Sequence, residues 1–229
     1  MIKVENVEVW GWKHAIRGMR NPMNSWDKSD SCFCPDEPSC EGNCAVHIGP
    51  NDLSLMQKLF KGGTEHRKYL RQIFVSLDIT APLYWWKEFD TYKVGTVANS
   101  CSTMHKIQAK EFTPDDFSHE HLMDSEEILQ GADVPFDSHG YSINDILSIT
   151  ISVLNFARMK FLETGNKTWW WQMIQLLPSS FNQRRTVTLT YENLFTIIRQ
   201  RTGHKLDEWN CLCEILKGLP YVKEIGGLS

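Results

Sequence analysis

The sequence has no long run of basic side chains, and its 229 residues carry a formal net charge of −4. Proteins that bind duplex nucleic acid or an anionic membrane surface usually present a basic patch, so neither partner is expected. No apolar run approaches the roughly 20 residues that cross a bilayer as a helix. The first 20 residues mix charged and apolar side chains, unlike a signal peptide. These absences predict a cytoplasmic protein.

Cysteine is scarce outside one segment, residues 32–47, which reads CFCPDEPSCEGNCAVH. Thiolates and an imidazole this close together could form a tetrahedral zinc site, but the spacing C-x-C-x5-C-x3-C is not a common zinc pattern. The other interpretation is a polar loop insertion with reduced thiols, whose turns are formed by proline and glycine. We therefore predict no metal, with one alternative ligand set: Cys32, Cys34, Cys40 and Cys44.

Hydrophobic periodicity and turn residues predict an α+β protein in which helices predominate. The sequence indicates a single domain over residues 1–229, with a Cys-rich loop insertion at 32–47 and an acidic surface excursion at 107–140. Strands are expected at 4–12 and 69–80, and residues 186–203 begin as a strand and end as a helix. Helices are expected at 13–21, 50–63, 83–93, 141–164, 168–177 and 204–218.

The segment 81–106, APLYWWKEFDTYKVGTVANSCSTMHK, combines aromatic and charged side chains with a polar tail. Its aromatic residues could line a ligand pocket and stack on a ring system. Equally, they could pack against the preceding strand and against partner subunits, because aromatic side chains dominate cores and interfaces. The residues concerned are Trp85, Trp86, Phe89 and Tyr92.

A strand ending in Ala81-Pro82, an aromatic helix and a polar loop follow one another here. In this order they resemble the flavin-dependent thymidylate synthases, whose signature R-H-R-x7-S lies within R-H-R-x-x-S-x-N-E-x-S-x-R-Y. Thr91-Tyr92-Lys93 occupies the place of Arg-His-Arg, and Cys101 that of the serine, with the same seven residues between them. The chain therefore resembles a divergent member that lacks the usual motif residues.

A second block, residues 176–201, is similar to the family's Leu-Pro segment, which leads through a strand into a helix ending in Leu-Arg. No gap is needed between Pro178 and Arg201. In the family, the arginine at the place of Arg201 reaches both nucleotide and flavin. Arg201 should therefore make a bidentate contact with a phosphate, whereas Arg199, two positions away on the helix, should face elsewhere.

The resemblance implies helices packed with an antiparallel or mixed sheet, and a homotetramer with sites between subunits. The nine tryptophans suit a large apolar interface. It also implies FAD as cofactor, with NADPH and methylenetetrahydrofolate as further reactants, and transfer of a one-carbon unit to C5 of a dUMP-like pyrimidine nucleotide. The residues it assigns to the cofactor are His66, Tyr92, Lys93, Asn99 and Arg201. Those assigned to the substrate are Lys87, Glu88, Ser100, Cys101, Ser102, Thr103 and Arg201.

Cys101 is the candidate catalytic residue. As a thiolate, assisted by Lys93, Lys106 or His105, it could attack C6 of a pyrimidine; as a structural residue it would be a small, half-buried filler. Each lost arginine removes charge-assisted hydrogen bonds worth roughly 1.5–3 kcal/mol, so dUMP conversion should be poor. Two alternatives therefore remain: a non-catalytic nucleotide-binding module, or an oligomeric regulatory protein on the same scaffold.

Overall fold

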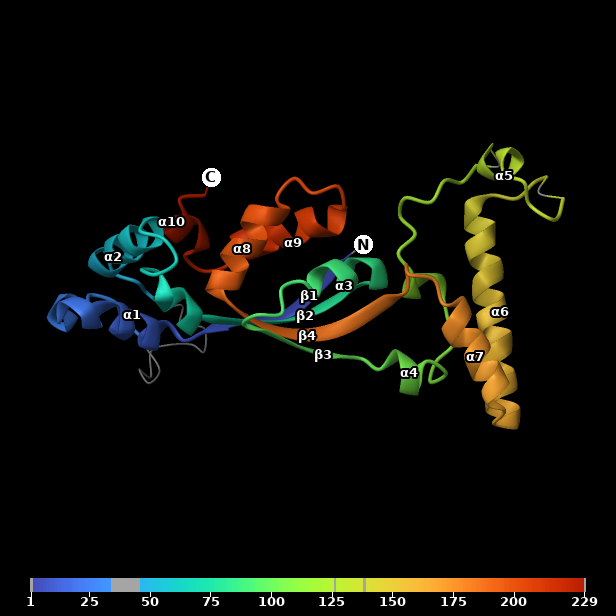
Figure 1. Ribbon diagram of the computed structural model, residues 1–229, viewed down its shortest axis with the longest axis horizontal. Helices are drawn as coiled ribbons and strands as arrows, with labels where there is room; N and C mark the ends of the chain where they lie inside the picture. The colour runs from blue at the N-terminus through green and yellow to red at the C-terminus, as the bar shows by residue number, and fades with distance from the viewer. Residues whose placement is uncertain (1, 34–45, 126, 138, 229) are drawn as a thin grey trace, which may run out of the picture. The chain divides into compact units, whose positions relative to one another are not determined.

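A computed structural model describes residues 2–33, 46–125, 127–137 and 139–228 (Figure 1). Contacts divide the chain into two compact units. Unit 1 comprises Met1–Lys3, Ile79–Thr91 and Asn99–Arg185, and unit 2 comprises Val4–Asp78, Tyr92–Ala98 and Thr186–Ser229. A single domain over the whole chain stays a prediction.

Four antiparallel strands form one sheet in the order β1-β2-β4-β3. Their bounds are Lys3–Trp10 (β1), Phe74–Pro82 (β2), Thr96–Ser100 (β3) and Asn182–Thr190 (β4). In β2 every second side chain is buried, from Val75 through Leu77 to Ile79, which is the period of a strand with one face on a core. The sheet and its helices confirm the predicted α+β fold class.

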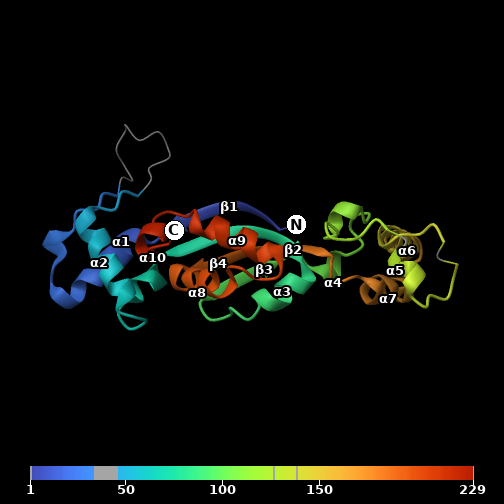
Figure 2. The same cartoon turned by 90° about the horizontal axis from the view of Figure 1, so that it is seen from above.

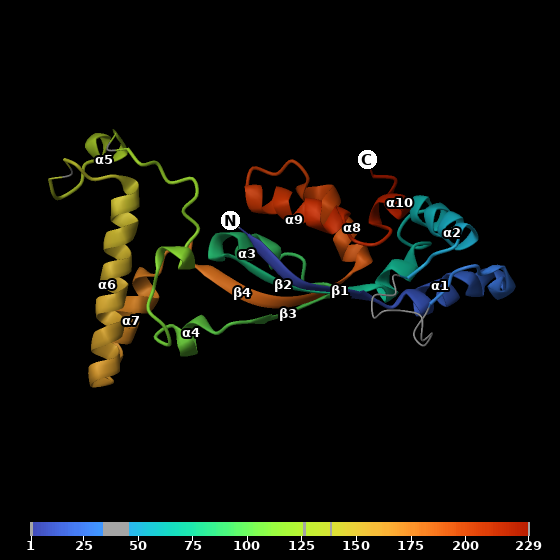
Figure 3. The same cartoon turned by 180° about the vertical axis from the view of Figure 1, so that it is seen from behind.

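Unit 2 contains five α-helices among its described residues, and Figure 3 shows α8 and α9 side by side over the sheet. Their bounds are Trp12–Arg20 (α1), Pro50–Lys61 (α2), Tyr191–Arg201 (α8), Asp207–Lys217 (α9) and Val222–Gly226 (α10), with short 3-10 helices at Asn21–Met23, Trp26–Lys28 and Lys68–Gln72 (η1 to η3). The ring of Trp12 meets that of Tyr191 edge-on at 5.2 Å. Gly11 precedes α1 at φ 95°, and a Cβ there would lie 2.0 Å from the Gln72 carbonyl oxygen. Only glycine fits this close approach.

A buried ion pair anchors α2 in unit 2. The Arg20 Nε lies 2.6 Å from Asp52 Oδ1, and the hydroxyls of Ser29 and Ser31 donate to Asp52 Oδ2 at 2.8 and 2.6 Å. Burial alone raises the pKa of Asp52, but these hydrogen bonds and the Arg20 charge outweigh it and hold the pKa below the usual aspartate value. The carboxylate is therefore ionised in the folded protein at neutral pH.

Unit 1 contains five α-helices among its described residues, and α6 and α7 pack side by side (Figure 2). Their bounds are Leu83–Phe89 (α3), Thr103–Lys106 (α4), Glu127–Gly131 (α5), Ile143–Thr164 (α6) and Lys167–Leu176 (α7), with a 3-10 helix at Pro114–Asp116 (η4). Ser142 caps α6 in a capping box with Asp145. Leu154 of α6 and Met173 of α7 are fully buried and belong to one hydrophobic cluster.

The segment 107–140, predicted from its acidity to be a surface excursion, contributes to that cluster. Ile107, Phe112 and Phe117 are buried in it. The Asn155 side chain of α6 donates to the Phe112 carbonyl oxygen and accepts from its N–H, at 2.9 and 2.8 Å. Apolar side chains between acidic residues thus hold the first part of the segment, residues 107–117, onto α6, which composition alone did not indicate.

Three local predictions differ from the structure. The strand expected over 69–80 begins only at Phe74, and Lys68–Gln72 form the 3-10 helix η3. The helix expected over 83–93 ends at Phe89, and residues 96–100, expected to be a polar loop, form β3. Gly95, at φ 77°, makes the turn between them, and the Asn193 amide donates to the Val94 carbonyl oxygen at 2.6 Å. A polar strand at the sheet edge has little hydrophobic alternation, so periodicity missed it.

The predicted alternative metal ligands Cys34, Cys40 and Cys44 lie outside the described residues. Cys32 and His47 are described, and their backbones pair at 2.8 and 3.2 Å. Among residues 2–33, 46–125, 127–137 and 139–228, no group of three metal-ligating side chains occurs. No helix in the described part of the chain combines the length and apolar character that crossing a bilayer requires.

Candidate functional site

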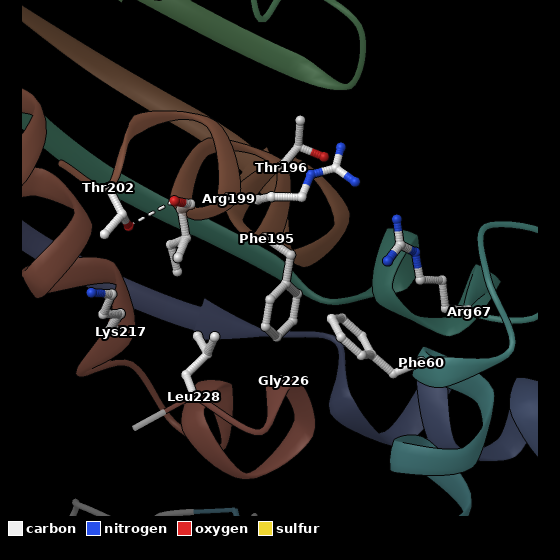
Figure 4. Close-up of a pocket in the computed structure, with 10 residues that line it drawn as sticks. Phe60, Arg67, Phe195, Thr196, Arg199, Thr202, Lys217, Gly226 and Leu228 are labelled. Carbon is white, nitrogen blue, oxygen red and sulfur yellow. Dashed lines mark hydrogen bonds between the residues drawn. The ribbon is translucent and has the colours of Figure 1, made fainter. Parts of the chain in front are cut away.

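Unit 2 contains a cavity of about 420 Å³ beside α8 (Figure 4). Its apolar wall includes Phe60 and Phe195, whose ring centroids are 4.7 Å apart at an angle of 57°. Helix α8 and its C-cap residue Thr202 contribute one face, because residues 195, 199 and 202 follow the i, i+4, i+7 spacing. The full lining is Phe60, Arg67, Phe195, Thr196, Ile198, Arg199, Thr202, Lys217, Gly226 and Leu228.

Three cationic side chains surround this wall. Arg67 lies 2.9 Å from Glu192 and over the Phe60 ring at 5.3 Å, and Lys217 lies 2.7 Å from Glu214. Arg199 is exposed and forms no ion pair or hydrogen bond within the described residues. Figure 4 shows its guanidinium directed toward that of Arg67. The cavity can therefore hold an anion beside an aromatic or aliphatic group.

The cavity is closely packed around Gly226, and a larger residue at this position would displace its neighbours. A Cβ at Gly226 would lie 2.7 Å from Phe195 Cε1 and 3.1 Å from Leu228 Cγ. Either ring or backbone would have to move to accommodate it. The shape of the cavity thus depends on this glycine at the end of α10.

Tyr92 and Arg201, two of the predicted cofactor residues, lie together in unit 2. Arg201 Nε donates to the Tyr92 hydroxyl at 2.9 Å, and the guanidinium carbon lies 4.5 Å from the centre of the Trp209 ring. Arg201 Nη1 is 3.1 Å from His204 Nε2. The predicted phosphate-binding arginine is therefore held by its own aromatic and polar neighbours, whereas Arg199, expected to face elsewhere, lines the cavity.

The remaining predicted cofactor residues are His66, Lys93 and Asn99. His66 and Lys93 are exposed residues of unit 2, and Asn99 is an exposed residue of unit 1. Their assignment to the cofactor stays a prediction.

Unit 1 contains a second cavity, of about 530 Å³, which brings together three of the predicted substrate residues: Cys101, Ser102 and Thr103. The Gln183 amide fixes this turn by donating to the Cys101 carbonyl oxygen at 2.9 Å and to Thr103 Oγ1 at 3.0 Å. The Ser102 hydroxyl caps α4 by accepting from the His105 N–H.

The cations of this second cavity are Lys106, Lys110 and Arg184, with Phe112 and Phe181 as aromatic lining. Lys110 is paired with Asp116. Cys101 itself is exposed rather than the half-buried filler that one interpretation predicted. It directly follows β3, which is an edge strand of the sheet. Hydroxyl groups, a thiol and cationic side chains thus line one space.

The other predicted substrate residues in unit 1 lie on exposed or half-buried positions: Ser100 is exposed at the end of β3, and Lys87 and Glu88 lie on α3. Trp85, Trp86 and Phe89 are almost completely buried. The Trp86 indole donates to the Gln183 carbonyl oxygen at 2.9 Å. The interpretation that these three rings stack on a ligand was therefore wrong, because almost none of their surface is accessible in unit 1. They pack on one another and form part of the core of that unit.

Sequence reasoning missed Arg67, Arg199 and Lys217. The shared helical face of Phe195, Arg199 and Thr202 was a usable signal. Arg67 and Lys217 come from segments far apart in the chain, and no spacing rule connects them to α8.

No protein-family model matches the sequence, and no curated protein matches it. Solved structures do. Thymidylate synthase X from Helicobacter pylori, crystallised with FAD and dUMP, matches with a TM-score of 0.61 and 16% identity, over 98% of this chain and 96% of its own. A second structure of the flavin-dependent enzyme from that organism, complexed with FAD and dUMP, gives a TM-score of 0.60 and 16% identity over 96% of each chain. The chain therefore has the fold of the flavin-dependent thymidylate synthases.

Proposed function

We propose that this chain binds FAD and a pyrimidine nucleotide and transfers a one-carbon unit to C5 of a dUMP-like substrate. The observation that carries the proposal is the cavity of unit 2, where three cations surround two packed phenylalanine rings. Support also comes from the fold, since the two similar structures hold FAD and dUMP.

The residues of the unit 2 cavity fit part of FAD. Arg67, Arg199 and Lys217 supply charge-assisted donors for phosphate oxygens, and Phe60 and Phe195 supply apolar contact for a ring. FAD, when bound, supplies the hydride for the reaction. NADPH as reductant and methylenetetrahydrofolate as one-carbon donor complete the proposed reactants.

The residues of the unit 1 cavity fit the nucleotide. Lys106 and Arg184 offer positive charge for its phosphate, and the Gln183 amide orients the turn that carries Cys101. A Cys101 thiolate can add to C6 of a pyrimidine ring, which makes C5 nucleophilic. Thr103 and Ser102 are the hydroxyl groups positioned to donate to the base or the sugar.

A second candidate function is nucleotide binding without synthesis. The contacts of Arg201 favour it, because its guanidinium is engaged with Tyr92 and Trp209. Thr91 and Lys93 also stand where the family's motif has arginines. If such a binding module assembles into an oligomer, the chain would be a regulatory protein rather than an enzyme.

Calorimetric titration of FAD and dUMP into the full chain tests both candidates. Arg199→Ala should weaken FAD binding about 10- to 100-fold, because one charged hydrogen-bonding partner is removed. Arg71→Ala is the matched control, since Arg71 is an exposed arginine of the same unit outside the cavity. Equal FAD affinity in all three proteins, or no FAD binding by the wild type, would refute the assignment of the cavity.

Turnover separates the two candidates. Conversion of dUMP to its C5-methylated product, followed by product analysis with FAD, NADPH and methylenetetrahydrofolate, should be slow and should stop in Cys101→Ala. Cys101→Ser, which keeps a weak nucleophile of similar size, should retain part of the activity. Binding of both ligands without any product would favour the second candidate.

A further inference from the structure

The turn that carries Cys101 is held on strand β4 by two hydrogen bonds. The Cys101 N–H donates to the Arg184 carbonyl oxygen at 2.9 Å, and the Cys101 carbonyl oxygen accepts from the Gln183 side-chain amide at 2.9 Å. The second donor belongs to a side chain, which extends the pairing of β3 with β4 beyond Ser100, where β3 ends. The place of Cys101 at the unit 1 cavity therefore depends on the orientation of the Gln183 amide.

Only one orientation of this amide suits both of its neighbours. Gln183 Oε1 accepts from Arg185 Nε at 2.9 Å, and Gln183 Nε2 donates to Thr103 Oγ1 as well as to the Cys101 carbonyl oxygen. An arginine N–H can only donate, and a carbonyl oxygen can only accept. In a flipped amide, nitrogen would face the Arg185 Nε–H and oxygen would face the Cys101 carbonyl oxygen. Arg185 thus selects the orientation in which Gln183 donates to the turn.

Arg185 is itself fixed by two further residues of unit 1. Its Nη1 lies 2.8 Å from Asp90 Oδ1, and its side chain is only 15% exposed. Its guanidinium carbon lies over the Trp86 ring, 4.2 Å from the ring centre. Trp86 is fully buried and donates from its indole to the Gln183 carbonyl oxygen at 2.9 Å, so the same ring also fixes the backbone of residue 183. A planar guanidinium can bond along its edge and stack with its face at the same time.

We propose that Arg185 is a positioning residue for Cys101: through Gln183 it holds the turn of residues 101–103 in the place from which the Cys101 thiol reacts. Arg185 is not among the described residues that line the unit 1 cavity, so it acts on the thiol through Gln183. The role of the thiol rests on the proposed function. The hold of Arg185 on the turn follows from contacts within unit 1 and can be measured without any ligand.

A positioning role affects the rate more than the affinity for the nucleotide. A nucleophile must lie close to the atom it attacks, and a displacement of about 1 Å can lower the rate by about 100-fold. The Lys106 and Arg184 side chains, which we assign to the nucleotide phosphate, are both retained when Arg185 is replaced. Loss of Arg185 should therefore lower kcat while the KM for dUMP changes little.

Amide hydrogen exchange of the unliganded chain, followed by mass spectrometry, tests the hold on the turn. Arg185→Ala should speed exchange of the Cys101 N–H by about 2- to 10-fold, the range expected when the equivalent of one neutral hydrogen bond is lost. Gln183→Glu should speed it as well, although its carboxylate binds Arg185 more strongly, because that carboxylate cannot donate to the Cys101 carbonyl oxygen. This second variant keeps the test decisive if Arg185→Ala fails to fold.

Arg158→Ala is the matched control for the exchange measurement. Arg158 is a half-buried arginine of unit 1 that donates from Nε to the Gln108 carbonyl oxygen at 3.0 Å. Its loss should leave exchange of the Cys101 N–H unchanged. Unchanged exchange in Arg185→Ala or in Gln183→Glu would overturn the proposal. Equal acceleration throughout unit 1 would overturn it too, since Arg185 would then be a general structural residue.

Turnover of dUMP with FAD, NADPH and methylenetetrahydrofolate tests the consequence for the reaction. Arg185→Ala should lower kcat at least about tenfold and change the KM for dUMP less than about threefold. Arg185→Lys should not restore kcat, because an ammonium group lacks both the directed Nε–H and the stacking face. A wild-type kcat in Arg185→Ala, or a loss confined to KM, would refute the positioning role. A wild type that forms no product would refute the proposed function instead, and the exchange result would then decide alone whether Arg185 holds the turn.

Discussion

Replacing Arg201 by alanine should destabilise the protein even when no ligand is present. The guanidinium lies over the Trp209 ring at 4.5 Å, donates to the Tyr92 hydroxyl at 2.9 Å and contacts His204. A cation–π contact of a partly exposed arginine contributes about 0.5–1 kcal/mol, and a hydrogen bond from a charged donor about 1.5 kcal/mol or more. Partial solvent screening reduces both, so we expect the free energy of unfolding to fall by about 2 kcal/mol.

Urea denaturation followed by circular dichroism and tryptophan fluorescence measures this change. Arg201→Lys should be nearly as destabilised as Arg201→Ala, because an ammonium group cannot reproduce the planar stacking and the directed Nε–H bond. Arg199→Ala is the control and should change stability by no more than about 0.5 kcal/mol, as expected for an exposed side chain that makes no ion pair or hydrogen bond with the residues the structure describes. Equal stability of wild type and Arg201→Ala would show that these contacts contribute nothing, and would restore Arg201 as a residue available to a ligand.

Two further predictions concern unit 2. Asp52→Asn should lower the free energy of unfolding at neutral pH. Because the pKa of Asp52 is depressed in the folded protein, the stabilisation by its carboxylate is present above about pH 4 and is lost as the pH falls through the folded pKa. The stability difference between wild type and variant in urea titrations should therefore shrink toward pH 2, and a difference independent of pH would contradict the depressed pKa. Gly226→Ala should destabilise the protein by roughly 1–3 kcal/mol, since the added Cβ would overlap the Phe195 ring. Gly131→Ala is the control and should be neutral or slightly stabilising, because a Cβ at that position meets nothing within 4 Å. Equal melting temperatures of the two variants would contradict the packing described around Gly226.

The sequence predicted most elements because their side chains follow strong periods. The alternation through Val75, Leu77 and Ile79 identified β2, and Gly62 and Gly218 marked helix ends. The resemblance rested on the spacing between Thr91 and Cys101 and on a contiguous match from Pro178 to Arg201, where strand and helix follow without insertion.

The site was harder to predict because it depends on side-chain direction rather than on position in a motif. Arg199 and Arg201 are two residues apart on α8, and a helix turns about 200° over that distance. The resemblance selected Arg201, but aromatic neighbours from distant segments hold it, and Arg199 reaches the cavity. Tertiary partners such as Trp209 cannot be read from local sequence.

The backbone pairing of Cys32 with His47 has a consequence for engineering. Each residue donates to and accepts from the other, as in a hydrogen-bonded pair of an antiparallel hairpin. The two ends of the intervening segment are therefore already adjacent, and a two-residue Asn-Gly turn spans the same gap. A tag or a recognition peptide inserted between Cys32 and His47 would therefore begin and end at adjacent backbone positions, provided that these two pairing residues are kept.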